Sequence, residues 1–454
     1  MPNESPAEAE LNIDADERPG LPGGDATPDP PRAEREISLW KQGDFLKLWS
    51  GQSVSMIGSQ VTLVALPLVA VTLLKASSVQ LGFLNALGYL PYLLVLFFGV
   101  WADRARRRPL LVGADLSRGV MVAIIPLAFW LGGLDIGLIY VVTFTVGLIS
   151  TMFDVSWSAY LPTLVSKQSL PEANSKMQLS SSIAQVSGPG LVALLLTWLS
   201  AAATMGIDAV SYFVSAAVCL SIRTPEAKPD RPAGSKKGIL QEISAGLRFV
   251  FSEDHLRPML LAQAIFMLFV PGIQALYAAY AYRDLHVSAS GVAFVLMLSG
   301  PGAIIGSILG PSIIKRIGLG RMCVIAALGG NTSYLFVPLA VKPLWLTIGM
   351  LGFGQFLYGF TMPLGVISMT TMRQAFTPNH MQGRIAAAFR CFSLGIAPFG
   401  ALAGGFLGAA IGLRPTMFID AVGALIPIAV LFLSPLPKVR QVADARAASE
   451  GKGR

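Results

Sequence analysis

The chain alternates between long apolar stretches and short polar ones. From residue 61 to residue 433, stretches of about 20 predominantly apolar residues recur, which is the length that an α-helix needs to cross the hydrocarbon core of a bilayer. The pattern predicts about twelve spans, at residues 61–74 with its upstream turns, 81–100, 110–131, 136–161, 177–199, 201–220, 259–282, 291–314, 322–341, 344–372, 386–411 and 416–433. It therefore predicts an all-α polytopic membrane protein.

The composition agrees with this prediction. Of the 454 residues, 53% are hydrophobic and only 13% are charged, which is too apolar for a surface that faces water. The net charge of +8 would suit a nucleic-acid-binding surface, but the basic residues lie in short loops between spans and not on one soluble face. We therefore expect the lipid bilayer as a partner and no nucleic acid.

The basic residues also predict the orientation of the chain in the membrane. If the N-terminus is cytoplasmic, most Lys and Arg residues fall in cytoplasmic loops, and the opposite face holds only Lys75, Arg283, Lys342 and Arg414. The positive-inside rule then predicts a multi-pass protein of the inner (cell) membrane with both termini in the cytoplasm.

The two halves of the chain resemble each other. Met205 and Asp208 in the sixth span match Met417 and Asp420 in the twelfth, at an offset of 212 residues. Six spans in each half give both repeats the same orientation, as in transporters whose halves are related by an axis along the membrane normal. The chain is therefore predicted to form two six-helix bundles related by a pseudo-twofold axis.

The polar segments complete the predicted domain organisation. The longest interruption between spans carries Ile239, Ile243, Leu247 and Val250 at helical spacing, which predicts an amphipathic helix along the cytoplasmic surface. We interpret this helix as a packing strut, with a regulatory site as the alternative. The predicted order is a disordered cytoplasmic tail at 1–38, a six-helix bundle at 39–222, a cytoplasmic linker at 223–256, a second six-helix bundle at 257–435 and a cytoplasmic tail at 436–454.

The loop after the second span resembles the loop signature of the major facilitator superfamily, through Gly99, Asp103, Arg104, Arg107 and Arg108. The runs at 153–155, 160–162, 381–384 and 389–390 resemble bacterial drug and siderophore efflux members of that superfamily, such as enterobactin and macrolide exporters. The resemblance extends over residues 45–436. It implies a twelve-helix fold and efflux by alternating access.

In the resembled fold this loop closes the cytoplasmic side. A carboxylate at a helix end can meet an arginine or a helix N-terminus, so Asp103 is expected to reach Arg384 at the start of the eleventh span. Ile314 stands where Asp103 would fall in the second half, so the contact is expected in one half only. The alternative is that these arginines only fix topology. The predicted cytoplasmic gate consists of Gly99, Asp103, Arg104, Arg107, Arg108 and Arg384.

Small residues recur at the i, i+4 spacing that lets helices approach closely in lipid. In the resembled fold the fifth span packs on the eighth and the second on the eleventh, so these residues are expected where the two halves slide, with static packing as the alternative. Gly188 and Pro189 resemble an antiporter signature, but Ala184, Val192 and Ala193 replace three of its glycines, so the support for antiport is modest. The predicted helix-packing residues are Gly188, Pro189, Gly302, Gly306, Gly310, Gly400, Gly404 and Gly408.

Three carboxylates within spans, Asp154, Asp208 and Asp420, are candidates for proton coupling, because a proton-driven carrier needs a group that can be neutralised inside the bilayer. The matching positions of Asp208 and Asp420 favour a structural role for both. Asp154 is the preferred proton site, with an ion pair to Arg118 as the alternative. Arg118 is itself one turn from Asp115, so a local pair between those two residues is also expected.

Amides among aromatic residues predict a cavity for an amphiphilic organic molecule. A small ion or a sugar phosphate would require more basic residues inside the membrane, where only Arg390 is available. Hydrogen bonds between helices are the alternative role for each amide. The substrate-cavity candidates are Gln60, Gln185, Gln274 and Gln355.

The sequence contains no nucleotide-binding or metalloprotease motif and has three His and three Cys. We therefore expect no catalytic residue, no metal and no cofactor, and predict that the protein is not an enzyme. The predicted function is secondary active export of a drug, siderophore or secondary metabolite by a monomer, by proton antiport with alternating access, as in multidrug resistance. Proton-coupled uptake, or a non-transporting sensor or lipid scramblase on the same scaffold, are the alternatives.

Overall fold

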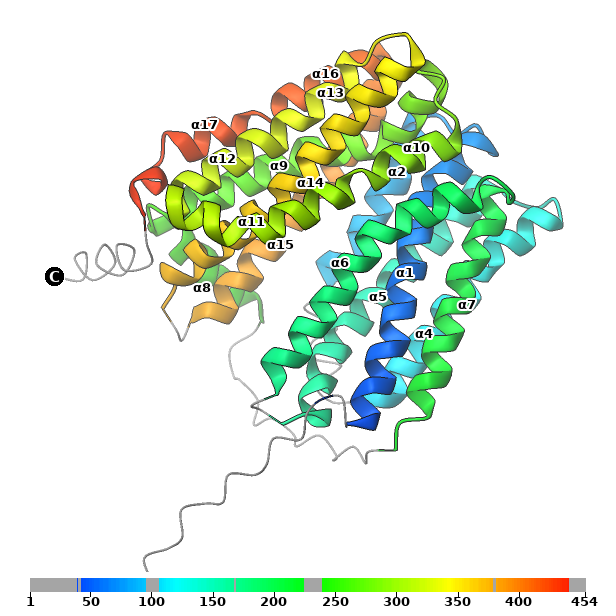
Figure 1. Cartoon of the computed structure of the whole chain (residues 1–454), viewed down its shortest axis with the longest axis horizontal. Helices are drawn as coiled ribbons and strands as arrows, with labels where there is room; N and C mark the ends of the chain where they lie inside the picture. The colour runs from blue at the N-terminus through cyan, green and yellow to red at the C-terminus, as the bar shows by residue number, and fades with distance from the viewer. Residues whose placement is uncertain are drawn as a thin grey trace, which may run out of the picture. The chain divides into compact units, whose positions relative to one another are not determined.

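A computed structural model describes residues 39, 42–94, 106–166, 169–223, 239–378 and 381–440. The described residues form helices and connecting turns, without a strand among them (Figure 1). Ten of the helical segments are long and apolar enough to cross a membrane. Two further expected spans correspond to a shorter helix that leads into residues 95–105, outside the described ranges, and to a more polar helix at Leu170–Leu195. The predicted all-α membrane fold is confirmed.

The N-terminal half contains six spans that pack as one bundle. The first helix packs along the fifth and sixth, and the third packs along the fourth and sixth. The elements are α1 (Gly43–Thr72), α2 (Ser78–Tyr89) continued by η2 (Leu90–Leu94), α4 (Arg107–Trp130), α5 (Ile136–Leu164), α6 (Leu170–Leu195) and α7 (Ala201–Leu220).

The C-terminal half contains six further spans, several of them built from two or three helical segments. Their elements are α9 (Leu256–Ala279) with η3 (Tyr280–Asp284), α10 (Ala289–Met297) with α11 (Ser299–Ile317), α12 (Leu319–Thr332) with η4 (Ser333–Leu335) and α13 (Phe336–Leu339), α14 (Leu344–Ala375), α15 (Gln382–Ile411), and α16 (Leu413–Gly423) with α17 (Ile426–Phe432); η6 (Leu436–Lys438) follows. At the break between α16 and α17, Asn331 donates a 2.7 Å hydrogen bond to the carbonyl oxygen of Ala424.

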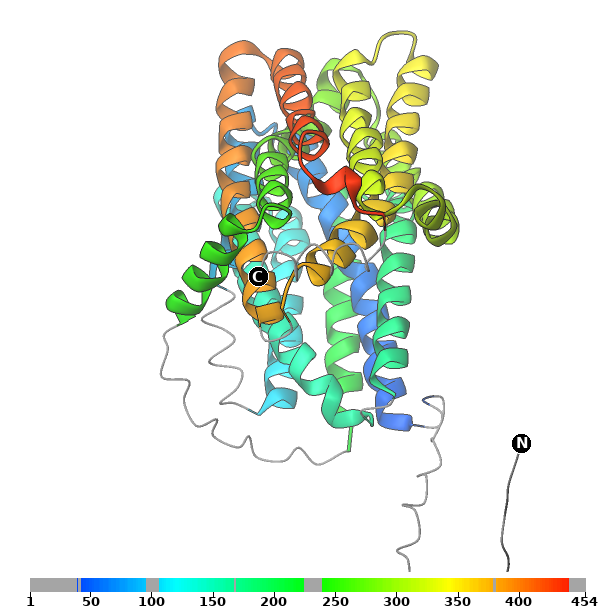
Figure 2. The same cartoon turned by 90° about the vertical axis from the view of Figure 1, so that its left-hand side faces the viewer.

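The predicted linker helix is present as α8 (Ile239–Ser252), and it packs beside the start of α15 (Figure 2). Val250 is fully buried, and the ring of Phe251 meets the ring of Phe392 edge to face, with centroids 6.1 Å apart. A Cβ atom at Gly246 would lie 2.8 Å from the carbonyl oxygen of Arg384. These contacts favour the packing role over a regulatory one.

The two ends of the molecule are distinguished by the direction of its helices. We call the end where α1, α4 and α15 begin the N-side, and the end where α1 gives way to α2 the far side. At the far side, four of the six described span starts carry side-chain caps, because unpaired backbone N–H groups there need acceptors, whereas α14 and α16 begin without one. The capping residues are Ser77 for α2, Asp135 for α5, Ser200 for α7 and Ser288 for α10.

The buried apolar side chains divide the molecule unevenly. One large cluster combines far-side residues of both halves, from Val61 and Met205 in the first half to Ile273 and Met417 in the second. On the N-side, by contrast, each apolar cluster of the described residues belongs to a single half. Two clusters lie in the N-terminal half, one of them around Leu111, and two lie in the C-terminal half. The two halves are therefore joined through the far side.

Two pairs of spans form most of the contact between the halves, α2 with α15 and α6 with α10 and α11, and α2 also packs against α9. This confirms the pairing of the second span with the eleventh and of the fifth with the eighth. A Cβ atom at Gly82 would lie 2.9 Å from the Cα atom of Gly405, so the backbones of α2 and α15 touch. At the second pair, Met297 of α10 packs on Gly190 of α6.

The prediction that the glycine ridges line this contact is wrong for most of them. Gly302 and Gly306 pack against the backbone of α14, and Gly310 packs against Leu364 of the same helix. Three other predicted glycines also face their own half: Gly400 and Gly404 pack against α9, and Gly188 packs against Gln60 of α1. Gly408 packs against Leu276 of its own half and also against Ser78 of α2, in the opposite half. The i, i+4 pattern identifies close helix packing but not which neighbour is packed, since every span has several neighbours.

Candidate functional site

Among the described basic side chains of the N-terminal half, that of Arg118 on α4 is the most enclosed. Its guanidinium lies between the rings of Phe153 and Tyr212, at 4.1 and 4.5 Å from their centroids. It forms an ion pair with Asp115, one turn earlier on the same helix, as predicted from their spacing. Two aromatic rings therefore lie against the guanidinium, and its charge is compensated locally.

A chain of hydrogen bonds extends from this ion pair to α1. Ser215 of α7 donates a 2.7 Å hydrogen bond to Oδ2 of Asp115, and Gln52 of α1 donates a 3.0 Å hydrogen bond to Ser215. Asp115 and Gln52 are both buried. Because α1, α4 and α7 each contribute a buried polar group, the network fixes the relative positions of these three helices.

Asp208 of α7 has hydrogen-bond partners on two helices. Thr62 of α1 donates to one carboxylate oxygen, and Ser211 donates to the other at 3.2 Å. Gly58 allows this approach, because a Cβ atom there would lie 2.7 Å from Oδ1 of Asp208. The carboxylate is fully buried and its partners hold α1 against α7. This geometry favours the structural interpretation of Asp208.

Asp420 of α16 occupies the matching place in the second half but lacks matching partners. Its carboxylate packs against Gly272 of α9 and Gly404 of α15, and it is only 4% exposed. Within the part of the chain that the structure describes, its Oδ2 atom has no hydrogen-bond partner. A buried ionised carboxylate without partners is strongly unfavourable. Of the three buried carboxylates among the described residues, Asp115, Asp208 and Asp420, only Asp420 therefore has a buried oxygen without a hydrogen-bond donor.

The reason for this difference lies in two substitutions between the halves. Gly58 and Gly272 are the glycines that face the two carboxylates. When the two halves of the sequence are aligned on these glycines, Leu276 of the second half stands where the first half has the hydroxyl-bearing Thr62. At the 212-residue offset, a glycine also replaces Ser211. The matching aspartates are thus conserved between the halves while both hydrogen-bond donors are absent from the second.

Asp154 of α5 faces a basic residue of each half. The residue is left partly uncovered by the rest of the protein, and its carboxylate lies within electrostatic reach of Arg118 and of Arg390 on α15. The guanidinium of Arg390 lies 5.7 Å from the ring centroid of Tyr92 on η2, so it is directed toward the N-terminal half. Arg118 pairs with Asp115, and among the described residues no carboxylate is within ion-pairing distance of Arg390.

Aromatic and amide groups lie next to this charged region. Tyr89 of α2 donates a 2.7 Å hydrogen bond to Gln274 of α9 across the contact between the halves. Tyr89 also lies within electrostatic reach of Tyr92 and of Tyr358 on α14. The ring of Tyr334 in turn lies 5.7 Å from that of Tyr358. The result is a group of tyrosines contributed by both halves.

The four predicted cavity amides do not form one cluster. Gln274 joins the tyrosine group through Tyr89, and Gln355 lies one helical turn before Tyr358 on α14. Gln60 packs against Gly188, while Gln185 is exposed and 3.5 Å from Ser181 on its own helix. Two of the four therefore adjoin the tyrosine group, and the other two lie along the contact between α1 and α6 or on α6 itself.

The predicted cytoplasmic gate is only partly described. Gly99, Asp103 and Arg104 lie outside the described residues, so the contact between Asp103 and Arg384 stays a prediction. Arg108 donates a 2.6 Å hydrogen bond to the carbonyl oxygen of Leu220 at the end of α7. A basic residue at the C-terminal end of a helix compensates its unpaired carbonyl groups. Arg108 thus stabilises its own half.

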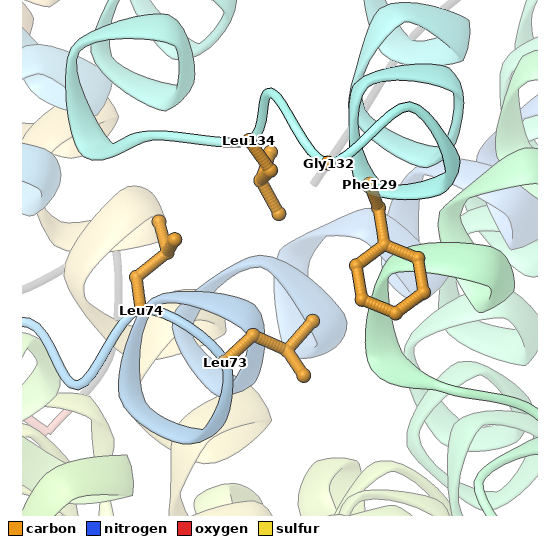
Figure 3. A pocket seen from close by; sticks show the side chains of 5 residues that line it. All are labelled: Leu73, Leu74, Phe129, Gly132 and Leu134. Carbon is orange, nitrogen blue, oxygen red and sulfur yellow. The ribbon is translucent and has the colours of Figure 1, made fainter.

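An open pocket on the far side has a different character (Figure 3). It lies between the end of α1 and the turn that joins α4 to α5. Its lining offers no charged or polar side chain that could orient a ligand. The lining residues are Leu73, Leu74, Phe129, Gly132 and Leu134. The charged and aromatic groups between the halves are therefore the better candidate site.

Sequence reasoning missed two features of this site. Tyr89 and Tyr92 were part of an apolar span, and Arg390 was noted only as a lone basic residue; their mutual approach depends on the packing of α2 against α15. The glycines that face Asp208 and Asp420 were also missed. The conserved spacing of Gly58 to Asp208 and of Gly272 to Asp420, 150 and 148 residues, was the available signal.

Two six-helix halves, joined on one side and carrying charged and aromatic groups where they meet, define a polytopic membrane transporter. Residues 36–451 match the family model described as transmembrane secretion effector, so the chain belongs to this family of the major facilitator superfamily. The protein is a multi-pass transporter that exports small molecules, and it is not an enzyme. Among the described residues, no group of His, Cys, Asp and Glu is placed to hold a metal ion.

Characterised relatives of similar length are efflux proteins. The chain is 24% identical over 412 residues to the multidrug efflux pump Tap of Mycolicibacterium fortuitum, covering 88% of this chain and 98% of that protein. It is 24% identical over 400 residues to the enterobactin exporter EntS of Escherichia coli O1:K1 / APEC, covering 87% and 92%. It is also 24% identical over 278 residues to macrolide efflux protein A of Streptococcus pyogenes, covering 60% and 66%.

Solved transporter structures share the fold. A mutant of the nucleoside transporter NupG matches with a TM-score of 0.70 and 11% identity, covering 86% of this chain and 99% of that one. A bacterial homologue of the iron transporter ferroportin in an inward-facing state matches with a TM-score of 0.67 and 15% identity, covering 86% and 98%. At these identities the likeness shows the fold alone.

Proposed function

We propose that this protein exports an amphiphilic organic molecule across the inner membrane in exchange for protons, with both termini in the cytoplasm. The tyrosine group between the halves supports this substrate class, because aromatic rings offer apolar contact area and Gln274 adds a polar anchor. The multidrug, macrolide and siderophore efflux proteins among the relatives handle molecules of this kind.

The proposed transport cycle is alternating access by the two halves. With the basic loops in the cytoplasm, the N-side is the cytoplasmic side. The apolar cluster shared by both halves lies on the far side, whereas the N-side clusters stay within single halves. This arrangement supports assignment of the structure to a state that is closed on the outside and able to open toward the cytoplasm, where an exporter loads its substrate.

Asp420 is the proposed proton-coupling site, in preference to Asp154 and Asp208. The observation that carries this proposal is the burial of its carboxylate against Gly272 and Gly404, with an Oδ2 atom that has no hydrogen-bond partner among the described residues. Protonation removes the charge, so the α9–α15–α16 junction closes over a neutral group, and separation of these helices lets the proton leave. Gly405, next to Gly404, contacts Gly82 of the other half. A movement between the halves would therefore also shift the part of α15 that packs against the Asp420 carboxylate.

The test is efflux from an efflux-deficient bacterial host. The host expresses the wild type, Asp420→Asn or Asp208→Asn, and accumulation of a macrolide, a catecholate siderophore and N-phenyl-1-naphthylamine is measured with and without a protonophore. The wild type is expected to lower the accumulation of at least one compound, and the protonophore to abolish this effect. Asp420→Asn is expected to lose export while keeping normal folded yield, whereas Asp208→Asn, the matched control, is expected to lose yield because Thr62 and Ser211 hold that carboxylate.

Each result has a distinct meaning. Unchanged accumulation of every compound would contradict export and favour a sensor or scramblase, and raised accumulation would indicate uptake. Export by Asp420→Asn with wild-type sensitivity to the protonophore and to external pH would show that this carboxylate does not couple transport to protons.

A further inference from the structure

We infer that Arg390 is the recognition site for an anionic group on the substrate. When no substrate is bound, the negative charge of Asp154 partly compensates the positive charge of Arg390. The inference rests on the proposed function, and it narrows the substrate class to amphiphiles that carry a carboxylate, sulfonate or similar acidic group next to an aromatic or apolar body.

Arg390 has the features of a binding group that is not used in folding. Within its membrane-spanning helix it is left exposed by the rest of the protein, and its guanidinium lies over the ring of Tyr92 in the N-terminal half. Ionisable residues inside membrane spans are costly and usually mark a substrate or ion pathway. Arg118 provides the internal comparison: it is buried, stacked between two rings and paired with Asp115, so it serves the fold.

The planar guanidinium suits an acidic ligand. It can donate two parallel hydrogen bonds to a carboxylate or sulfonate, a geometry that lysine does not offer. The ring of Tyr92 lies beside the guanidinium of Arg390, and Tyr89 lies three residues before Tyr92 in the same span. A ligand whose acidic group meets Arg390 could therefore rest its apolar part on these tyrosines.

Asp154 explains how an unliganded arginine is tolerated in this place. It lies on the opposite half, within electrostatic reach of Arg390 but beyond ion-pairing distance among the described contacts. Its negative charge partly compensates Arg390 without a direct bond, so an incoming anion meets no ion pair that must first be broken. An acidic substrate would replace this weak attraction with direct hydrogen bonds and would contact both halves.

The experiment measures binding, and so does not depend on transport. The purified full-length protein in phosphatidylcholine nanodiscs is titrated with 8-anilino-1-naphthalenesulfonate and with N-phenyl-1-naphthylamine, which shares the ring system but lacks the sulfonate. Empty nanodiscs supply the background. Arg390→Gln is expected to weaken binding of the sulfonate at least about tenfold, because a charge-assisted contact is lost, and to leave the uncharged probe unchanged. Arg390→Lys is expected to restore part of the loss, and Asp154→Asn to tighten sulfonate binding severalfold.

Two results would overturn the inference. One is wild-type affinity of Arg390→Gln for the sulfonate, and the other is equal loss of both probes, which would indicate that Arg390 supports the fold. Because export is not measured, a failed efflux assay would leave a positive binding result intact, and a failed binding result would leave proton-driven export of uncharged compounds intact.

Discussion

The guanidinium of Arg283, at the end of η3, donates a 2.7 Å hydrogen bond to the carbonyl oxygen of Ala76, in the turn between α1 and α2. This bond joins the two halves at the far side. Arg283→Gln is expected to weaken far-side closure by about 1.5 kcal/mol, or about tenfold in population, because a charge-assisted hydrogen bond is lost. Spin labels at Trp198→Cys and Trp345→Cys, two exposed far-side positions in opposite halves, should then report a longer distance in a background without the native cysteines.

Arg414 supplies the matched control. It lies on the same side and donates a 3.0 Å hydrogen bond to the carbonyl oxygen of Pro338, but both residues belong to the C-terminal half. Arg414→Gln should leave the distribution of label distances as it is in the wild type. An equal shift in both variants would mean that the bond from Arg283 does not hold the halves together.

The contact between Gly82 and Gly405 leads to a second prediction. A Cβ atom at Gly82 would lie 2.8 Å from the carbonyl oxygen of Ala401 and 2.9 Å from the Cα atom of Gly405, both backbone atoms of α15. Gly82→Ala must therefore push α2 away from α15, and overpacking of this kind costs about 1–3 kcal/mol. We expect the protein to fold and the efflux rate to fall at least about fivefold, measured per folded molecule. Gly88→Ala, on the same helix with nothing within 4 Å of the added atom, should transport normally; equal rates for the two variants would contradict a role for close α2–α15 contact.

The sequence was sufficient for the fold because its strongest signals are long-range apolar periodicity and internal repetition. Span length and the spacing of Ile239 to Val250 predict the helices from local pattern, and the match of Asp208 with Asp420 predicts the two bundles from repetition along the chain. The partners of the glycine ridges were not predictable in this way. Gly404 and Gly405 are adjacent in sequence, yet one faces α9 in its own half and the other faces α2 in the opposite half.

The candidate site was less accessible to sequence reasoning, because its properties depend on partners from distant spans. The pattern assigned Asp208 and Asp420 the same structural role by symmetry. Only the packed structure shows that Thr62 and Ser211 serve the first carboxylate while Gly272 faces the second. A hydrogen-bond partner 146 residues away in sequence, as for Thr62 and Asp208, leaves no local signature.

The ion pair between Asp115 and Arg118 leads to the last prediction, which concerns stability. Asp115 is fully buried and Arg118 is 5% exposed, so removing one partner leaves a charge in an apolar bundle. Asp115→Leu is expected to lower the free energy of unfolding by on the order of 3 kcal/mol, because Arg118 then keeps only the more distant carboxylates of Asp154 and Asp208 as counter-charges. The double variant Asp115→Leu with Arg118→Met leaves no buried charge of this pair and should recover most of the loss. Thermal unfolding in detergent measures the stability of both variants. A double variant at least as unstable as the single one would show that the balance of charge does not make this network stabilising. The hydrogen bonds from Ser215 to Asp115 and from Gln52 to Ser215 would then be the source of its stability.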